Sequence, residues 1–463
     1  MRIKKSGTAP SAGAIYCLTS IITKAVTLAT TPIFTRIMNS EEYGKYILYI
    51  SLYGICVAAA SVGASSGVIY NVYSEREDKI REISFAGFLT SIPITAVVCI
   101  LLFAFSNILK LQSEALPLLF IHTVLDVLIS SYLLKFRYVY KAFWIFTVEV
   151  VKSVGSVLLS YYLVSSLGFG YIGRVLGFVL TLAPIALLTL FFFGRSLFRI
   201  PYPIMSRVTK NALPASVSAL FLSIGVYLVN IVISVSLGKE SLAVFSIFNT
   251  VATSPVFLIT ALIAALAPSI QRETESRSIE KIRDMYCSSS ALISAIIMLV
   301  SLISKEALAF LAPESYDADL FIILPLLLYS QLKLSDQFLS CVLNAKRIYR
   351  YSLISNVIFS SATLAVLLLL LRVIGLFAAG LSLLIGVALS VMHKLMHITG
   401  GSLSVLSVGD LISSFVGVLG FCFLALSLSD MPALRTLLAI IPAIRLLNVY
   451  YQRPHSKPGI INE

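Results

Sequence analysis

Charged side chains are scarce in this sequence. Asp, Glu, Lys and Arg make up 12% of its 463 residues, whereas hydrophobic residues make up 58%. Soluble domains contain about 25% charged and about 45–50% apolar residues. Apolar stretches of about 20 residues, each long enough to cross a hydrocarbon core of roughly 30 Å, recur along the whole chain. This composition argues against a soluble protein and predicts an all-α polytopic membrane protein.

Cysteine frameworks and catalytic signatures are also missing. The six cysteines lie within or beside apolar segments without any CxxC spacing, so we expect reduced packing residues. No P-loop, nucleophile elbow or Rossmann signature is present, which argues against ATP-driven transport by this chain alone. "HKLMH" (His393 and His397) has the spacing of two metal ligands but lacks the glutamate of HExxH. No loop is long enough for a soluble catalytic domain, so we expect neither an enzyme nor a cofactor.

Fourteen segments have the length and apolarity of membrane-crossing helices. The first follows "MRIKKSGTAP" and is too long for a signal-peptide core, so we expect an uncleaved helix. The last spans only if Arg435 and Arg445 both snorkel, and a twelve-helix core with a looser final hairpin is the alternative. The predicted spans are 12–37, 44–72, 83–105, 115–134, 143–164, 172–193, 212–237, 242–268, 285–304, 320–343, 351–371, 374–392, 409–428 and 432–450.

Successive loops between the predicted spans alternate between many and few Lys and Arg residues. About three in four of those outside the spans fall on the side of the N-terminus, with Arg174 counted in an outer loop and Lys394 in an inner one. This bias predicts that both chain ends are cytoplasmic. It also accounts for most of the net charge of +13, so we infer no binding to nucleic acid.

A long basic segment, "GRSLFRIPYPIMSRVTKN", divides the helices into two sets of six. It is either an interfacial segment on anionic headgroups or an ordinary basic linker. "NSEEYGKYILYI" (Asn39–Ile50) matches "GKESLAVFSIFN" (Gly238–Asn249), and "GFGYIG" matches "GLFAAG" at a similar offset. These matches favour a duplicated six-helix unit, as is common in transporters. The predicted parts are an N-terminal lobe (1–193), a linker (194–211), a C-terminal lobe (212–400) and two extra helices with a tail (401–463).

Six charged residues fall within the predicted spans: Lys24, Asp126, Glu149, Lys152, Lys333 and Asp336. Each costs roughly 2.5–3.5 kcal/mol when it faces lipid, so each must face protein or water. Polar residues at helical spacing also form stripes on the first, seventh and tenth spans. Facing one another, the stripes would enclose a hydrated cavity between the lobes. They comprise Ser20, Lys24, Thr27 and Thr31; Ser216, Ser223, Tyr227, Asn230 and Ser234; and Ser330, Lys333, Gln337, Ser340 and Asn344.

Some of these charges can pair on their own helix. Glu149 with Lys152, and Lys333 with Asp336, are three residues apart and can neutralise each other. The pairs either fix helix packing or serve transport. His122 lies four residues before Asp126, and the two either relay protons, bind a cation or pack as buried groups.

The stretch "TKAVTLATTPIFTRIMNSEEYGKY" resembles the N-terminal signature of the polysaccharide (oligosaccharide) flippases, the Wzx-type branch of the MOP superfamily. The features are a basic residue in the first span, a proline near its exit and an acid–Tyr–Gly turn into the second span. They are Lys24, Pro32, Arg36, Glu42, Tyr43, Gly44 and Tyr46. The resemblance implies two six-helix bundles in a V around a central cationic cavity, with two further C-terminal helices.

The resemblance also implies a function. Such proteins, in the bacterial inner membrane, move undecaprenyl-pyrophosphate-linked oligosaccharides for O-antigen, lipopolysaccharide, capsule or exopolysaccharide synthesis, beside a polysaccharide polymerase. An H⁺ or Na⁺ gradient drives the movement. Lys24 and Lys333 are then the candidates for the diphosphate. Lys152, Tyr227, Asn230 and Gln337 complete the substrate set, and Asp126, His122, Asp336 and Glu149 form the ion-coupling set.

Two features depart from the family pattern. The repeat places Ser223, not a base, opposite Lys24, and Asp126 and Asp336 make the predicted cavity less cationic. A lipid II flippase is an alternative that fits the helix count but not the EEYG turn. A MATE-type cation or drug antiporter is another, although a carboxylate rather than Lys24 is expected in its first span. A non-transporting scaffold would not need the three polar stripes.

Overall fold

The computed structural model describes residues 9–64, 77–104, 106–107, 115–138, 142–193, 202–276, 278–316, 318–346, 348–399 and 408–451. These residues form helices joined by short turns, with no strand among them. The fold is therefore all-α, as predicted. Ten of the described helices are long and apolar enough to cross a membrane.

The helices of the first half follow the predicted spans closely. The second begins where Asn39 accepts a hydrogen bond from the Glu42 backbone N–H at 2.8 Å, a typical N-cap contact. The helices are α1 (Ala9–Ile37), α2 (Ser40–Ala64), α4 (Glu77–Ala104), α5 (Ala115–Tyr138), α6 (Ala142–Ser165) and α7 (Gly170–Phe193).

The second half contains longer helices and two short 3-10 turns between α11 and α12. Its helices are α8 (Tyr202–Ser236), α9 (Lys239–Ala252), α10 (Ser254–Glu275), α11 (Ile279–Leu311), η2 (Glu314–Tyr316), η3 (Leu320–Ile322), α12 (Ile323–Ala345), α13 (Tyr349–Ile374), α14 (Phe377–Thr399), α15 (Val408–Ser427), α16 (Pro432–Leu438) and α17 (Ile440–Tyr451).

Three predicted segments differ from the structure. The span 242–268 is two helices, because α9 ends before Thr253 and α10 begins after it. Pro255 lies in the first turn of α10, where a backbone N–H would have no partner within the helix, so proline is tolerated there. The span 432–450 is also divided, into α16 and α17. The helix α8 begins at Tyr202, ten residues before the predicted span 212–237 and inside the predicted linker 194–211. Residues 194–201 lie outside the described part of the chain.

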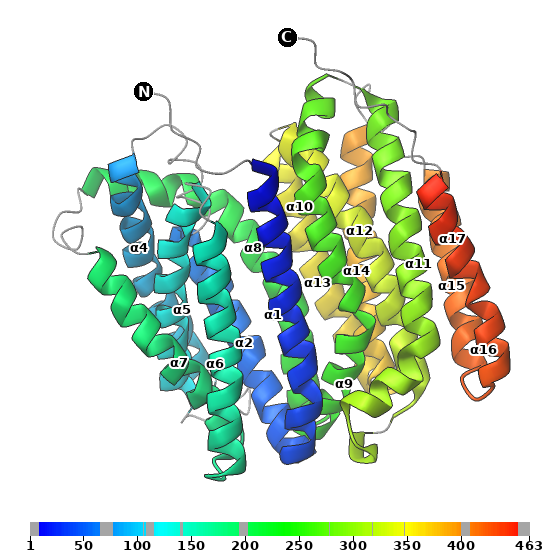
Figure 1. Cartoon of the computed structure of the whole chain (residues 1–463), viewed down its shortest axis with the longest axis horizontal. Coiled ribbons are helices and arrows are strands. Elements are labelled where there is room, and N and C mark those ends of the chain that lie inside the picture. Colours follow the sequence, from blue (N-terminus) through cyan, green and yellow to red (C-terminus); the bar gives the residue numbers. More distant parts are fainter. Residues whose placement is uncertain are drawn as a thin grey trace.

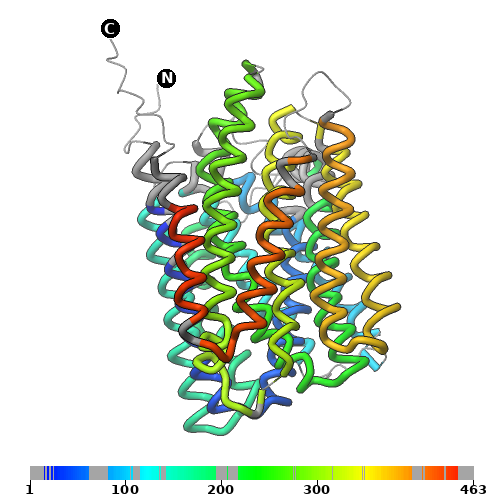
Figure 2. Tube along the Cα trace, turned by 90° about the vertical axis from the view of Figure 1, so that its right-hand side faces the viewer, coloured from blue at the N-terminus to red at the C-terminus, as the bar shows by residue number. Residues whose placement is uncertain are grey.

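The helices pack in two groups that meet along α2 (Figure 1). In the first group each helix contacts the next along the chain from α2 through α4, α5 and α6 to α7, and α1 packs against α6. The second group contains α8, α10, α12, α13 and α14. α2 lies against α8 and α9, and α1 also touches α10 and α11. α15 and α17 pack on α11, at the edge of the bundle (Figure 2). The division into two duplicated lobes stays a prediction.

The end of the bundle where α1 finishes is here named the far end (Figure 1). There α1 is hydrogen-bonded to the end of α11, and Met38, which follows α1, is hydrogen-bonded to η2. Thr35 Oγ1 donates to the Leu311 carbonyl at 2.6 Å, and Arg36 Nη2 donates to the Phe310 carbonyl at 2.9 Å. Burial raises the pKa of Tyr316 to about 12, so its hydroxyl stays protonated and donates to the Met38 carbonyl at 3.5 Å. These bonds close the two helix groups onto each other.

The acid–Tyr–Gly turn contributes to the same closure. Gly44 lies directly against the backbone of α9, where a Cβ atom would be 1.9 Å from the Lys239 carbonyl oxygen. Glu42 Oε2 accepts the Tyr171 backbone N–H at 2.8 Å and so binds one of the unpaired N–H groups at the start of α7. Tyr43 packs edge-on against Tyr316.

Candidate functional site

A cavity of about 270 Å³ lies inside the first helix group, between α1, α2, α5, α6 and α7. It is wide enough for several water molecules and is bordered by both charged and hydroxyl groups. The residues that line it are Thr23, Val26, Thr27, Thr30, Tyr46, Ile50, Tyr53, His122, Asp126, Glu149, Lys152, Ser153, Ser156, Val157, Arg174, Phe178 and Leu182. Three of the four predicted ion-coupling residues therefore share one space with the predicted substrate residue Lys152.

Asp126 and Lys152 form the central ion pair of this cavity. Lys152 Nζ donates to Asp126 Oδ1 at 2.6 Å and reaches Glu149 Oε1 at 3.4 Å. Tyr53 completes the group by donating its hydroxyl to Asp126 Oδ2 at 2.7 Å. The predicted pair Glu149–Lys152 is thus present, but the shorter bond of Lys152 is to Asp126 on the neighbouring helix. One ammonium serves two carboxylates.

His122 lies beside this group in a stack of aromatic rings. Its ring centroid is 4.0 Å from that of Tyr53 and 5.4 Å from that of Phe178, and its Nδ1 is 3.1 Å from the Tyr49 hydroxyl. Among the described residues no hydrogen bond joins His122 to Asp126. Proton transfer between the two would need a bridging group such as a water molecule, so the relay stays a prediction.

The threonines of α1 present oxygen lone pairs to the cavity. Thr27 Oγ1 donates to the Thr23 carbonyl and Thr30 Oγ1 donates to the Thr27 carbonyl, both at 2.9 Å. Since each hydroxyl hydrogen is used on the helix itself, the free capacity of these groups is to accept hydrogen bonds. Lys24 lies on α1 between Thr23 and Thr27, and its side chain is outside the described part of the structure.

Arg174 is not a loop residue, as the charge count assumed, but a lining residue of this cavity. It lies in α7, one turn after the Tyr171 N–H that Glu42 binds, and its side chain is 5% exposed. Its guanidinium carbon is 3.9 Å from the centre of the Phe34 ring and 4.9 Å from that of Phe178. The one sequence feature that indicated a helical position for Arg174 is that it is the third residue of the predicted span 172–193.

A second charged group is buried in the other helix group. Asp336 on α12 accepts a hydrogen bond from Lys333 of the same helix at 2.9 Å. It also accepts hydrogen bonds from two residues of α14, Ser390 at 2.8 Å and Lys394. Lys333 is 5% exposed and lies 5.3 Å from the Phe359 ring, so it faces protein, which is one of the two expected surroundings. Lys394 is fully buried within α14 rather than in an inner loop, because the helix continues to Thr399.

The three predicted polar stripes have different surroundings, and the hydrated cavity between the lobes stays a prediction. The stripe of α8 packs on α2, where Tyr227 lies against Gly54 and Asn230 donates to Ser51 Oγ at 2.9 Å. The stripe of α12 is bound by its neighbours, as Gln337 donates to Thr260 of α10 at 3.3 Å. Several members of the stripes therefore contact protein, whereas Thr27 and Asn344 are exposed.

The histidine pair of "HKLMH" is held by ordinary contacts. His393 Nδ1 lies 2.8 Å from Ser355 Oγ, and the His397 ring lies 4.0 Å from that of Tyr351. Within the described residues no cluster of three or more His, Cys, Asp or Glu side chains is placed to hold a metal ion.

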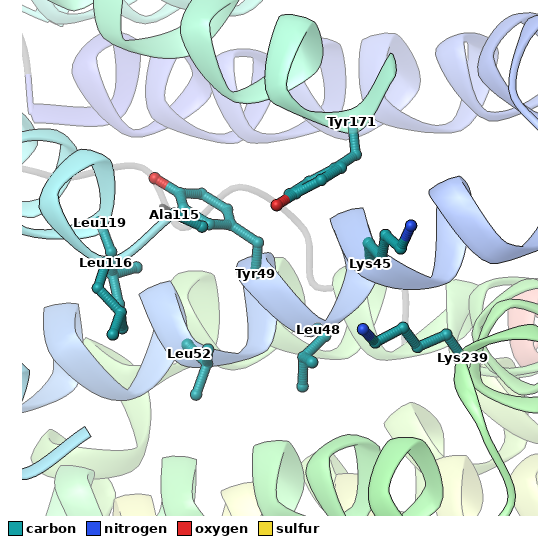
Figure 3. A pocket seen from close by; sticks show the side chains of 9 residues that line it. All are labelled: Lys45, Leu48, Tyr49, Leu52, Ala115, Leu116, Leu119, Tyr171 and Lys239. Atoms are coloured by element: carbon teal, nitrogen blue, oxygen red, sulfur yellow. The ribbon is translucent and has the colours of Figure 1, made fainter. Parts of the chain in front are cut away.

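A smaller cavity of about 30 Å³ lies near the far end, where α2, α5, α7 and α9 meet. Figure 3 shows Lys45 and Lys239 at one end of it, with the rings of Tyr49 and Tyr171 above Leu48. Its volume admits about one water molecule. This region therefore belongs to the closed end of the bundle rather than to a substrate path.

Comparison with known proteins gives a likeness of fold. No protein-family model matches the sequence, and a comparison with curated proteins finds no match either. The structure resembles an inward-facing multidrug resistance MATE family transporter of the MOP superfamily (15% identity, TM-score 0.63, 88% of this chain and 98% of that chain). An outward-facing transporter of that family has a TM-score of 0.61 at 15% identity, over 90% of this chain and 97% of that chain.

A third similar structure is a MOP superfamily transporter from Pyrococcus furiosus, described as having a binding pocket of reverse polarity that suggests a different function. It is 15% identical, with a TM-score of 0.60 over 92% of this chain and 97% of that chain. The likeness extends through nearly the whole of each transporter. This multi-pass membrane protein has the fold of the MOP superfamily transporters.

Proposed function

We propose that the chain moves an undecaprenyl-pyrophosphate-linked oligosaccharide across the bacterial inner membrane by ion-coupled alternating access. The observation that carries this proposal is the lining of the 270 Å³ cavity, which combines two cations, Lys152 and Arg174, with several hydroxyl groups. Cations suit a diphosphate, and hydroxyls suit the many donors of a sugar. The MOP fold supplies a transporter framework for that site.

In this proposal the two helix groups are the moving bodies. The N-terminal lobe (1–193) and the C-terminal lobe (212–400) rock against each other along α2 and α8, and the far-end bonds of Thr35 and Arg36 hold one of the two states. The carboxylates of Asp126 and Glu149 are the proposed sites of ion coupling. Sharing one ammonium leaves them able to bind a proton or a sodium ion.

A cation antiporter is the second candidate function, and one observation favours it. Asp126 and Glu149 outnumber Lys152 at the centre of the cavity, and paired carboxylates in an apolar surround attract cations. Against it stands Arg174 in the same cavity, which repels a cationic substrate.

Deleting the gene in its native bacterium tests the flippase. We expect surface polysaccharide to be lost and lipid-linked oligosaccharide to accumulate, and the wild-type gene to restore display. The Lys152→Ala gene is expected to restore at most about one tenth of the wild-type amount of surface polysaccharide, because the substitution leaves two carboxylates without their ammonium partner. The matched control is Lys305→Ala, which removes a half-exposed lysine outside the cavity and is expected to behave as wild type.

Two results would contradict the proposal. Normal polysaccharide display in the deletion strain excludes a flippase role for the chain. Efflux of a cationic dye from proteoliposomes containing the purified protein, abolished by Asp126→Asn, favours the antiporter instead.

A further inference from the structure

Arg174 holds a buried positive charge without an acidic partner among the described residues. Its side chain is 95% buried, and its Nε and Nη1 atoms have no hydrogen-bond partner. These two nitrogens carry three of the five N–H donors of a guanidinium. Buried polar groups without partners are rare in proteins, and a charged one demands an explanation.

Aromatic rings surround Arg174 without neutralising it. Its guanidinium carbon lies 3.9 Å from the centre of the Phe34 ring, 4.9 Å from that of Phe178 and 5.4 Å from that of Tyr46. A desolvated cation–π contact contributes about 2 kcal/mol, whereas removing an ion from water costs several kcal/mol. The rings come from α1, α2 and α7, so they hold the guanidinium in place at the cavity wall.

The nearby carboxylates are already bound to other groups. Asp126 is paired with Lys152 and Tyr53, and Glu149 with Lys152. Glu42 binds Lys45 and the start of α7. No carboxylate described in this region bonds Arg174, so its positive charge has no counter-charge among the described residues.

We infer that Arg174 is a binding site for a phosphoryl anion, with the hydroxyl acceptors of Thr27 and Thr30 positioned for the sugar attached to it. The planar guanidinium matches the oxygens of a phosphate, and Arg is preferred where such recognition is needed. The threonine hydroxyls have donated their hydrogens to the helix, so they suit sugar O–H groups rather than phosphate oxygens. This inference rests on the proposed function and names the residue that meets the head of the substrate.

Binding to the purified protein in nanodiscs tests the site, with inorganic pyrophosphate, glucose 1-phosphate and geranyl diphosphate as probes. We expect Arg174→Gln to weaken binding of all three by about 10- to 100-fold, because a charge-assisted contact is lost. Arg174→Lys keeps the charge but not the planar fork, and is expected to bind more weakly than wild type and more tightly than Arg174→Gln. Arg372→Gln, at an exposed arginine in the last turn of α13, is the matched control and is expected to leave the binding of all three probes unchanged.

Thr27→Val tests the sugar part of the site separately. Valine has the shape of threonine without its acceptor, so we expect weaker binding of glucose 1-phosphate and unchanged binding of pyrophosphate. Thermal unfolding of each variant identifies misfolding, and Arg174→Lys keeps the test decisive if Arg174→Gln does not fold.

Unchanged binding of all three probes to well-folded Arg174→Gln overturns the inference. A loss confined to pyrophosphate and glucose 1-phosphate supports the anion site with a free phosphate compound as its ligand, and a loss that includes geranyl diphosphate supports the lipid-linked head. The proposed function fails separately, since it falls if the deletion strain displays normal polysaccharide whatever Arg174 binds.

Discussion

Replacing Asp336 by asparagine is expected to remove most of the folded protein from the membrane. Among the described residues, Asp336 is the one carboxylate that pairs with Lys333 and Lys394, two lysines that are 5% and 0% exposed. Asparagine keeps the shape of the side chain but leaves two buried ammonium groups facing each other. Removing one partner of a buried ion pair costs about 3–5 kcal/mol, and repulsion between the lysines adds to it. A loss of this size is comparable with the whole stability of many proteins.

The measurement is the yield of folded protein in detergent and its unfolding by denaturant. Two neighbours supply matched controls. Ser390→Ala removes a hydrogen bond from an uncharged donor to the Asp336 carboxylate and is expected to cost about 1.5–3 kcal/mol, less than Asp336→Asn. Lys394→Met, which leaves a balanced Lys333–Asp336 pair, is expected to cost far less than Asp336→Asn and to restore part of the stability when combined with it.

The opposite order of effects would change the role given to these residues. If Asp336→Asn folds normally while polysaccharide display is lost, the group serves transport rather than packing. If Lys394→Met is as harmful as Asp336→Asn, the second lysine is needed for more than its charge.

The sequence predicted the short-range part of both charged groups. Glu149 with Lys152, and Lys333 with Asp336, are neighbours on one helix, and helical geometry alone brings them together. Tertiary packing added the rest, because Asp126 reaches Lys152 from α5 and Lys394 reaches Asp336 from α14. Nothing in the sequence of one helix specifies which neighbour it will face.

The missed cations, Arg174 and Lys394, both lie near predicted helix ends. A charge near a span boundary is normally assigned to a loop, and boundaries are uncertain by two to four residues. Here α14 continues past Lys394 to Thr399, and α7 begins before Arg174 at Gly170. The helices are longer than their apolar cores, so charges at both ends are drawn into the protein.

The flippase-like signature also has a structural meaning that its residues alone did not reveal. Arg36 binds the end of α11, Glu42 binds the start of α7, and Tyr46 lies 5.4 Å from the Arg174 guanidinium. These residues therefore close the far end and position the wall of the cavity. Two signature residues, Arg36 and Glu42, therefore hold helices together at the far end, whereas Tyr46 lines the proposed substrate cavity.

Replacing Gly44 by alanine is expected to open the far end of the bundle. The new Cβ atom would lie 1.9 Å from the Lys239 carbonyl oxygen, whereas an ordinary contact begins at 3.4 Å. The obstacle is backbone, which cannot rotate away, so α2 and α9 must separate. We expect a loss of about 1–3 kcal/mol in stability and a shift of the population toward states open at the far end.

Spin labels at Glu41 and Glu314, in a cysteine-free protein, report that shift as a longer and broader distance between α2 and η2. The matched control is Gly420→Ala in α15, where a Cβ atom meets nothing within 4 Å. There alanine favours the helix, so we expect unchanged distances and a gain of up to about 1 kcal/mol. If Gly44→Ala and Gly420→Ala give the same distances and the same stability, close approach of α2 to α9 is not what holds the far end shut. If Gly44→Ala separates the helices while polysaccharide display persists, closure at this end is not a required step of transport.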